Sequence, residues 1–577
     1  MWQLTKQPKE KKAMPMSVKS ARSFLWMCAG FTFSSVAFFF AFGFEMMKRR
    51  SRPEPTEVLR DGKKVVIVGA GTAGATLAAS LTAYRPEIQV TVIDPSRYHT
   101  FVGAVPLAAA GHRSYDLCTY GPNSLVSTSV WAVTREAELI VQGVEHIDTK
   151  KQVVKDTSGK EHEYDYLVMA CGAQRDLSVI KGVTEKDVDV HRFCINPHAV
   201  RDTLCAARTG NFMVCRVNGE ENSPYTRSTE GNYISTVNTV WKFLKHFGRL
   251  SQSRFYAVTE DEDPSDALPS IYNEVIKKFW DQRGTPHLGN HKLTYVDPKN
   301  CKATFKNKLD GTTQTIDYKL LYVELPLKAP KIIKKSGLDG KGTCGFVDVD
   351  PQTLQSRKFF NIFAIGDCAA LKSAKSYGAV FAQVPVVTHN LSQLIDRDIA
   401  ITERVAKEVT EKEPIRQHGT VPQFGRKLTE EEEEALSRQT LKEKEEILAK
   451  IQRLRREELL KAPMPVLEGR YNGYSSFHIN MTTWRCMWPE VEGDKQRVNY
   501  HLWDNAAYED WRGFLNGAYL QLAAYEMMYW VFFLRGWWYP PRWFSYPTFS
   551  KEELERVEQQ AAAAAANASA SGAVKLA

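Results

Sequence analysis

The fold is indicated first by Gly69-Ala70-Gly71-Thr72-Ala73-Gly74, a stretch with glycine at its first, third and sixth positions. Each glycine has its own physical role in a turn of this pattern. Gly69 permits the tight turn, Gly71 lets the backbone approach a pyrophosphate, and Gly74 lets a helix pack closely on a strand. The stretch therefore predicts a dinucleotide-binding turn.

The segments around this turn have the composition that the turn requires. Residues 63–68 form a short β-branched run, residues 75–81 an apolar helical pattern, and residues 89–94 a second strand. That strand ends in Asp94, whose carboxylate can accept hydrogen bonds from ribose hydroxyls. Because strand, turn, helix and acid all agree, the sequence predicts a β-α-β unit of Rossmann type.

A second β-α-β domain, expected within residues 183–335, lacks these signs. Its first strand, residues 211–217, is followed by residues 218–224, which hold one glycine and two acids. Carboxylates at this place would repel a pyrophosphate instead of binding it. The sequence therefore predicts that the chain takes no NAD(P), which argues against NADH-dependent reductases.

Four stretches of the chain together resemble the mitochondrial-type sulfide:quinone oxidoreductase family: residues 69–74, 361–368, 471–476 and 527–530. The likeness covers most of residues 62–400 and resumes at 470–549. It implies an α/β fold with two Rossmann-like dinucleotide-binding domains of the flavoprotein disulfide-reductase type, and FAD as cofactor. The residues that it implies for FAD binding are Gly69, Gly71, Thr72, Ala73, Gly74, Asp94, Gly172, Gly366 and Asp367.

The resemblance also implies two redox cysteines beside the flavin, but the matching positions carry other residues. The first falls near Ser223, where the match is loose, and the second falls at Phe477, where the register is tight. In that chemistry a thiolate is both nucleophile and redox centre, so neither serine nor phenylalanine can replace it. We therefore expect no catalytic residue for sulfide oxidation.

Other cysteines are poor substitutes for the missing pair. Cys215 and Cys486 lie several residues from the expected positions, and only a loop that folds back would bring their sulfur atoms into bonding range. Cys171 and Cys368 belong to the strands expected around the flavin, where small buried filler is the ordinary role of a cysteine.

Residues 23–44 contain no charged side chain and are rich in Phe, Val, Ala and Met. A helix of about 22 residues spans ~33 Å, enough to cross a hydrocarbon core of ~30 Å. The segment is therefore predicted to be a single-pass transmembrane anchor, and basic residues flank both of its ends. A cleaved targeting sequence is the competing interpretation. With the family resemblance, the anchor predicts a location in the mitochondrial inner membrane.

Composition excludes several other classes of function. The 577 residues carry a net charge of +9, and no basic stripe with interleaved aromatic residues is present, so we expect no nucleic-acid partner. The ten cysteines include no Cys-x-x-Cys pair and no metal-ligand spacing, so we expect no metal.

The C-terminal part of the chain has the composition of a membrane-docking surface. Residues 525–539 are rich in Trp, Tyr, Met and Phe but too short to cross a bilayer as a helix. They resemble the family's amphipathic segment, which implies contact with membrane lipid and an entrance for quinone. The alternative is an aromatic core helix. Whether quinone binds here is left open by the sequence.

Residues 401–465 are predicted to be a charged helical insertion that the family likeness does not cover. Leu441, Ile447, Leu448, Ile451 and Leu454 form one narrow apolar stripe, which needs a packing partner. Packing on the chain's own body and docking to another subunit are equally compatible with the stripe.

These observations leave two hypotheses for the function. The chain is either a pseudoenzyme that serves as a structural or accessory subunit of an inner-mitochondrial-membrane complex, or an active FAD-dependent quinone reductase. The contacts with other subunits would come from the N-terminal helix, the 401–465 insertion and the tail. The expected segments are a basic arm and transmembrane helix (1–50), a linker (51–61), the FAD-binding domain in two parts (62–182 and 336–400), the second Rossmann-like domain (183–335), the insertion (401–465), the membrane-docking region (466–550) and a tail (551–577).

Overall fold

The computed structural model describes residues 63–492 apart from internal gaps, which are 86, 101–104, 110–136, 220–222, 230, 267, 269, 413–445, 448, 452, 456, 460, 482–485 and 488. The predicted anchor, linker, tail and aromatic segment 525–539 therefore lie outside the described residues. Within the described part of the chain, no helix has both the length and the apolar character needed to cross a bilayer.

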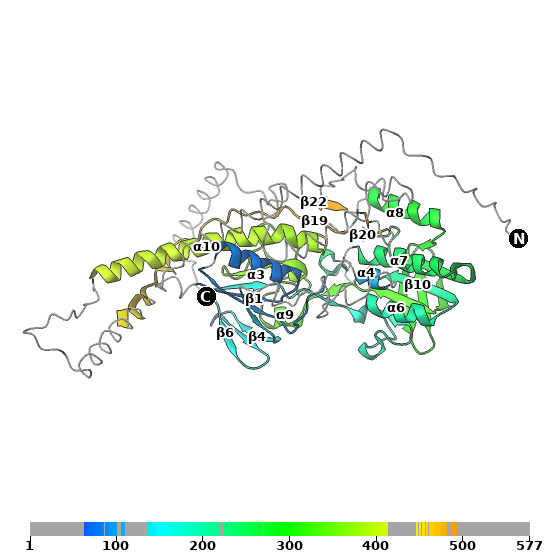
Figure 1. Cartoon of the computed structure of the whole chain (residues 1–577), viewed down its shortest axis with the longest axis horizontal. Helices are drawn as coiled ribbons and strands as arrows, with labels where there is room; N and C mark the ends of the chain where they lie inside the picture. Colours follow the sequence, from blue (N-terminus) through cyan, green and yellow to red (C-terminus); the bar gives the residue numbers. More distant parts are fainter. Residues whose placement is uncertain are drawn as a thin grey trace, which may run out of the picture.

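The first domain is built on a parallel five-stranded sheet. The order of its strands is β18 (Ile362–Ala364), β7 (Tyr166–Met169), β1 (Lys64–Val68), β2 (Gln89–Ile93) and β3 (Glu138–Ile140). The inner strands β1 and β7 are almost wholly buried, as expected of β-branched and apolar runs covered on both faces. Two helices, α3 (Thr72–Tyr84) and α10 (Tyr377–Lys412), pack against each other in this domain (Figure 1).

The predicted β-α-β unit is confirmed, with its expected boundaries nearly unchanged. β1 pairs with β2 in parallel, so that Lys64 lies opposite Gln89 and Val68 opposite Ile93, and α3 connects the two strands. A parallel pair of this kind requires a crossover connection, which the apolar helical pattern after the glycine turn supplies. Asp94 follows β2 directly.

The second domain has its own parallel five-stranded sheet. The strands run in the order β12 (His287–Leu288), β11 (Ser253–Thr259), β10 (Gly210–Arg216), β16 (Leu320–Glu324) and β9 (Phe193–Cys194). The helices of this domain are α6 (Pro197–Ala206), α7 (Asn232–His246) and α8 (Ser270–Arg283), with the short α4 (Val105–Ala109) packed on α6 and α7. Figure 1 shows this domain beside the first one, at the end away from the free end of α10.

Smaller antiparallel elements complete the two domains. One three-stranded sheet joins β4 (Val144–Asp148), β5 (Val153–Asp156) and β6 (Glu161–Glu163), and another joins β13 (His291–Asp297), β14 (Lys302–Asn307) and β15 (Thr313–Asp317). The chain passes between the domains at the pair β8 (Gln174–Arg175) and β17 (Leu327–Lys328). Short pairs near the C-terminal end of the described chain are β19 (Tyr474–Ser476) with β22 (Glu490–Glu492) and β20 (Ile479–Asn480) with β21 (Cys486–Met487), and α9 is Lys331–Lys335.

The predicted start of the insertion at residue 401 lies inside a helix. α10 continues without a break from Tyr377 to Lys412 and so crosses that boundary. The helix continues past residue 400 because the apolar side chains of Ile401, Val405 and Val409 extend its buried face. Figure 1 shows the last part of α10 projecting beyond the sheet.

The projecting part of α10 has a partner from its own chain. The described residues between 446 and 461 are helical, and Ile447, Ile451 and Leu454 pack against the apolar face of α10. Leu441 and Leu448 lie outside the described residues. At least these three positions of the predicted stripe therefore rest on the chain's own body, which is one of the two alternatives that the sequence left open.

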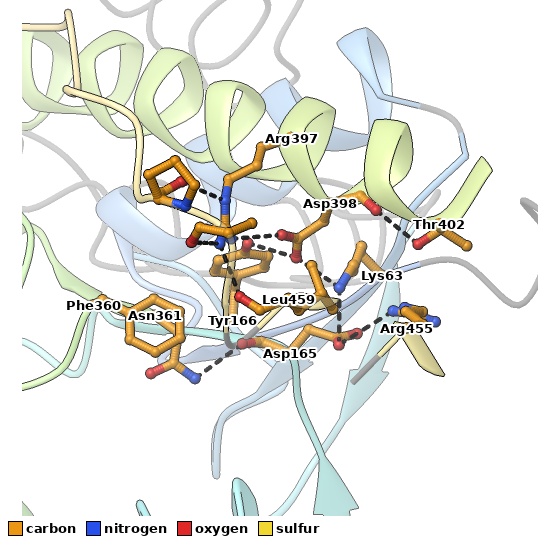
Figure 2. Close-up of polar contacts among 12 residues, drawn as sticks. Lys63, Asp165, Tyr166, Phe360, Asn361, Arg397, Asp398, Thr402, Arg455 and Leu459 are labelled. Atoms are coloured by element: carbon orange, nitrogen blue, oxygen red, sulfur yellow. Dashed lines mark hydrogen bonds and ion pairs between the residues drawn. The ribbon is translucent and has the colours of Figure 1, made fainter. Parts of the chain in front are cut away.

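A buried ionic network holds α10 to the start of β1 (Figure 2). Lys63 Nζ lies 2.6 Å from Asp398 Oδ2 and 3.4 Å from Asp165 Oδ1. The Tyr166 hydroxyl donates to the same carboxylate oxygen of Asp398 at 2.8 Å, and Arg397 lies 3.1 Å from its other oxygen. Only 5% of the Lys63 side chain and 6% of the Asp398 side chain are exposed, so each charge depends on its partner.

Arg397 extends the network to the chain that follows the insertion. Its guanidinium donates to the carbonyl oxygens of Leu459, Ala462 and Pro463 at 2.9, 2.7 and 3.0 Å. These carbonyls end a helix, where the last C=O groups have no partner within the helix. One arginine therefore fixes the end of the insertion against α10.

Replacing Asp398 by asparagine should destabilise the protein by roughly 3–5 kcal/mol, because the buried Lys63 and Arg397 charges then lose a shared counter-ion. Urea unfolding monitored by circular dichroism measures this difference. The control is Glu411→Gln, which removes an exposed partner 3.9 Å from Lys407 on the same helix and should cost under about 0.5 kcal/mol. Equal effects of the two substitutions would contradict the assigned role of the network.

Candidate functional site

The glycine turn has the geometry that its sequence predicts. Gly69 has a φ of +103°, a conformation that side-chain-bearing residues rarely adopt. A Cβ atom added at Gly74 would lie 1.8 Å from the carbonyl oxygen of Gly69, so helix and strand cross closely here. A Cβ added at Gly71 would meet nothing within 4 Å. The turn is therefore open on the side of Gly71, where a phosphate would approach the N-terminus of α3.

Asp94 lies directly beside this turn. Its Oδ2 accepts a hydrogen bond from the Ala70 N–H at 2.7 Å, and its Oδ1 accepts one from the Ser96 N–H at 2.7 Å. Each carboxylate oxygen can accept more than one hydrogen bond, so Asp94 can still receive ribose hydroxyls. The structure thus brings the predicted acid and the predicted glycines into one site.

His99 is hydrogen-bonded to the backbone of the glycine turn. Its Nδ1 donates to the carbonyl oxygen of Ala70 at 3.2 Å, and only 3% of the residue is exposed. Burial lowers the pKa of His99 from 6.5 to about 4, although the hydrogen bond to Ala70 acts in the opposite direction. Sequence reasoning missed this residue, since a single histidine after Asp94 carries no distinguishing pattern.

The segment Gly366-Asp367 approaches the glycine turn at the start of α3. Gly366 has a φ of +71°, and its Cβ position is 3.1 Å from the Cβ of Ala73 at the start of α3. Its N–H donates to Gln383 Oε1 at 2.7 Å. Two segments about 300 residues apart along the chain therefore meet at the N-terminus of α3, as the resemblance implied.

A buried lysine accompanies this second segment. Lys375 is 4% exposed, and its Nζ donates to the Asp367 carbonyl oxygen at 2.7 Å and lies 4.4 Å from the centre of the Phe346 ring. Burial raises the pKa of the Asp367 carboxyl, and the Lys375 ammonium opposes that shift. A pocket with an empty volume of about 200 Å³, its open mouth included, lies between these groups and is lined also by Gln383.

Neither Lys375 nor Gln383 was a predicted site residue. The signal that could have found Lys375 is a cation within a stretch of small and apolar residues after Gly366-Asp367, where an exposed helix face is not expected. Gln383 could not be found from sequence, because its link to Gly366 depends on how α10 packs.

The remaining predicted cofactor positions are close to this site. Thr72 and Ala73 are the first two residues of α3, whose N-terminus points its backbone N–H groups toward the turn. Gly172 follows β7 with a φ of +64°, and its neighbour Cys171 has its Cα 2.9 Å from the Cβ position of Gly69. Gly69, Gly71, Thr72, Ala73, Gly74, Asp94, Gly172, Gly366 and Asp367 therefore gather at the carboxyl ends of β1, β2, β7 and β18.

Phe477 lies in a buried apolar cluster. It is 1% exposed and belongs to the same buried cluster as Tyr233, Ile234 and Ala374. Its ring comes within 3.2 Å of the Cβ position of Gly231, which precedes α7. The segment is held on α10, since a Cβ at Gly378 would lie 2.2 Å from the Ser476 carbonyl oxygen. The benzyl group therefore packs beside the start of α7, and the neighbouring Ser476 lies against α10.

Ser223 has a local structural role. Its hydroxyl accepts a hydrogen bond from the Tyr225 N–H at 3.3 Å and caps a short 3-10 helix, Pro224–Thr226. Its carbonyl oxygen accepts from the Thr226 N–H at 3.1 Å. These contacts are those of a turn residue, and a hydroxyl in this place supplies no redox chemistry.

The turn after β10 differs from the turn after β1. The Asn218 N–H donates to Glu260 Oε1 at 3.2 Å, and the Asn218 side chain donates to Asp261 Oδ2 at 2.8 Å. In the first domain the corresponding region faces open space at Gly71, whereas here two carboxylates of the chain occupy the donors. The described residues also contain no group of three or more His, Cys, Asp or Glu side chains arranged to hold a metal ion.

Replacing Gly74 by alanine should destabilise the protein by roughly 1–3 kcal/mol or prevent folding, because the new methyl group collides with the Gly69 carbonyl. Gly71→Ala is the matched control, and its added methyl group meets open space, so its unfolding midpoint in urea should stay close to that of the wild type. Equal tolerance of both alanines would contradict the close crossing.

Acidification should weaken the fold partly through His99. Its folded pKa of about 4 lies below the ordinary 6.5, so the unfolded chain binds the proton first as the pH falls. The stabilisation is therefore present above pH 6.5 and is lost as the pH falls toward 4, by about 3 kcal/mol for a shift of this size. Urea unfolding at pH 7 and pH 4.5 should show a smaller loss for His99→Gln, since glutamine does not titrate. An unchanged loss in the variant would show that other groups carry the dependence.

Comparison with known proteins agrees with a dinucleotide-binding fold of the disulfide-oxidoreductase type. Residues 63–215 match the family model described as pyridine nucleotide-disulphide oxidoreductase. The chain is 28% identical to mitochondrial sulfide:quinone oxidoreductase of Schizosaccharomyces pombe, over 58% of this chain and 74% of that protein. It is 27% identical to the mouse mitochondrial protein of the same name, over 57% of this chain and 70% of that protein.

Two solved structures have a similar fold. The sulfide:quinone oxidoreductase of Aquifex aeolicus superposes with a TM-score of 0.50 at 21% identity, covering 58% of this chain and 78% of that one. A chain in the mitochondrial ATP synthase of Tetrahymena thermophila superposes with a TM-score of 0.55 at 19% identity, covering 85% of this chain and 100% of that one. By sequence, the chain is therefore similar to the mitochondrial sulfide:quinone oxidoreductases, and it has a fold like that of the Aquifex aeolicus enzyme.

Proposed function

We propose that the chain is a pseudoenzyme without sulfide oxidation that serves as a structural subunit of a mitochondrial inner-membrane complex. The observation that carries this proposal is Phe477, buried in an apolar cluster at the position where the family resemblance implies a redox thiol. A benzyl group is neither nucleophile nor electron carrier, so the sulfur chemistry has no second partner. Ser223, with its hydroxyl used as a helix cap, supports the same conclusion for the first position.

The packing around Phe477 would make replacement of this residue by cysteine destabilising. The ring fills space beside the start of α7 that a smaller thiol would leave partly empty, at a cost of several kcal/mol for a large-to-small change in a core. The two segments that meet here therefore use the residue for stability. This is the kind of change expected when a fold is kept for its shape.

The proposed role as a subunit is supported by the similar fold of a chain in the Tetrahymena thermophila mitochondrial ATP synthase. That likeness covers 85% of this chain, against 58% for the Aquifex aeolicus enzyme. At 19% identity it indicates the fold alone, and we take from it that a chain of this shape can be part of an ATP synthase. We propose an assembly of that kind as the host, with mitochondrial relatives supporting the location.

The anchor and the C-terminal region are proposed as the contacts with the membrane. Residues 23–44 would form a single-pass helix and residues 466–550 would dock on lipid, both as expected from composition. The N-terminal helix, the 401–465 insertion and the tail would contact neighbouring subunits. The projecting part of α10, braced by Ile447, Ile451 and Leu454, gives the insertion a rigid base for such a contact.

FAD is proposed as the bound cofactor, with neither NAD(P) nor metal. The open turn at Gly71, the N-terminus of α3, Asp94 and the Gly366-Asp367 segment fit a pyrophosphate, a ribose and a ribityl chain. FAD when bound supplies a two-electron carrier, and the chain's own groups bind and orient it. The carboxylates of Glu260 and Asp261 at the Asn218 turn support the expectation that NAD(P) does not bind.

The alternative is an active FAD-dependent quinone reductase with another electron donor. The observation that favours it is the intact glycine turn, since Gly69, Gly71, Gly74 and Asp94 all keep a geometry suited to a dinucleotide. The two hypotheses share the site and differ in whether electrons pass through it.

Adding sulfide and a short-chain quinone to the purified full-length protein tests the proposal. We expect no bleaching of flavin absorbance and no quinone reduction, because no thiol pair lies at the expected positions. Native electrophoresis of gently solubilised mitochondrial membranes should show the chain far above its own mass of 65.4 kDa. A mitochondrial sulfide:quinone oxidoreductase measured in parallel serves as the positive control. Rapid bleaching, or a chain that migrates alone, would overturn the proposal.

A further inference from the structure

The C-terminal end of α7 carries an exposed aromatic ring among positive charges. Lys245, His246 and Phe247 are all exposed, and 55% of the Phe247 surface is open to solvent. The helix ends here, where Gly248 takes a φ of +66°, a left-handed conformation that suits glycine. We call the following group the α7-end patch: Lys245, His246, Phe247, Arg249 and Arg208.

The Phe247 ring is held in its exposed position by its neighbours. Its centre lies 4.6 Å from that of the Phe243 ring and 4.9 Å from that of the His246 ring. The guanidinium carbon of Arg249 lies 5.4 Å from the centre of the Phe243 ring and 5.5 Å from that of Phe247. A cation at such a distance from an aromatic face is attracted to it. The ring is therefore supported from the protein side while more than half of the residue stays exposed.

Arg249 also joins the end of α7 to the end of α6. Its Nη1 donates to the carbonyl oxygen of Leu204 and, at 2.8 Å, to that of Ala207. Carbonyl groups at a helix end have no partner within the helix, so this contact fixes the two helix ends together. Arg208 follows directly after Ala207 and is exposed. The patch therefore has positive charges from both sides of the joint.

The positive charges of the patch are not balanced locally. Residues 231–259 contain no Asp or Glu, and Asp202, the one acid of α6, is preceded by Arg201. Within the part of the chain that the structure describes, no carboxylate lies in ion-pair contact with the three cations of the patch. Lys245 instead lies 4.8 Å from the centre of the Trp241 ring. The patch therefore presents a positive surface to an anionic ligand.

The chain that leads into residues 466–550, the predicted membrane-docking region, runs along the same helix. The Asn480 N–H donates to the Ser235 hydroxyl at 2.9 Å, and Arg283 donates to the Met481 carbonyl oxygen at 3.4 Å. The guanidinium carbon of Arg283 lies 4.5 Å from the centre of the Trp241 ring, one helical turn before Lys245. The described start of that region therefore runs toward the end of α7 that carries the patch.

We propose that the α7-end patch binds a membrane surface that contains anionic phospholipid, with its cations at the headgroup phosphates and Phe247 at the boundary with the acyl chains. Basic side chains beside an exposed aromatic ring are the combination that interfacial segments use. The surface belongs to the second domain and is made of other residues than the proposed anchor and docking region. It depends neither on the loss of sulfide oxidation nor on a host complex.

The exposed ring favours a lipid surface over an acidic protein segment. Carboxylates of such a segment can pair with Lys245, Arg249 and Arg208, but they give the ring no apolar surroundings. A phospholipid surface supplies phosphates for the cations and acyl chains for the ring, so removal of the ring from water adds to the attraction between charges.

Hydrogen exchange of the full-length protein tests this surface. Exchange is measured by mass spectrometry on peptides from residues 242–252, so the result is local and does not depend on what else holds the chain to lipid. Vesicles of phosphatidylcholine are compared with vesicles that also contain phosphatidylglycerol. We expect slower exchange only with phosphatidylglycerol, and loss of this protection at about 0.5 M salt, which screens charges beyond ~4 Å.

Substitutions of exposed residues test the assigned roles. Lys245→Gln and Arg208→Gln should each raise the vesicle concentration needed for half of the protection about fivefold, the factor expected for one basic residue near an anionic surface. Phe247→Ser should also weaken the protection but keep its dependence on salt. Lys186→Gln is the matched control, since this exposed lysine lies between Val183 and Val188, which pack on the opposite face of the second sheet.

Two results would overturn the proposal. One is equal exchange of residues 242–252 with the two kinds of vesicle, or equal weakening by Lys186→Gln and Lys245→Gln. The other is protection by a soluble poly-glutamate peptide without protection by phosphatidylglycerol, which would assign the patch to an acidic protein partner. Circular dichroism of each variant shows whether its fold is kept, and the sulfide and quinone assay tests the proposed function separately.

Discussion

The arrangement of the first domain depends on the close crossing of α3 over β1 at Gly69 and Gly74. Because neither residue has a side chain, the helix begins within contact distance of the strand end, and its first N–H groups face the open turn. Everything else at this edge packs on that crossing: Asp94 accepts the Ala70 N–H, His99 donates to the Ala70 carbonyl, and Gly366 touches α3 at Ala73. A side chain at either glycine would move all of these groups together.

The junction of the two domains is closely packed around residues 474–480. The backbone of residues 474–480 is tightly fitted, with Ser476 against Gly378 and the Asn480 N–H donating to the Ser235 hydroxyl at 2.9 Å. Phe477 then adds apolar area to a cluster that already contains Tyr233 and Ala374. Such burial stabilises the junction, but it places a group without redox chemistry where the family resemblance implies a thiol. A fold does not by itself imply a reaction, so the proposal of a pseudoenzyme rests on this side chain and not on the architecture.

Much of the first domain could be predicted from sequence, because the physical signals are local. β1, α3, β2 and the acid after it lie within residues 63–94, and each element has its own composition and spacing. The end of α10 could not be predicted, since its continuation past residue 400 depends on a second helix that covers Ile401, Val405 and Val409. The network of Lys63, Asp165 and Asp398 joins three distant segments, and no local pattern in the sequence relates them. The same holds for Gln383 and Lys375 at the site.

From the amino-acid order alone came the Rossmann unit and the family resemblance, together with two predictions: nine cofactor positions, and the replacement of both expected redox cysteines. Glycine spacing, strand composition and the identity of one residue are properties that can be read without coordinates. Only the three-dimensional packing showed that Phe477 is a core residue and that carboxylates occupy the donors at the Asn218 turn. These facts arise from contacts between segments far apart in the chain, where proximity is set by how sheets and helices pack and not by sequence distance.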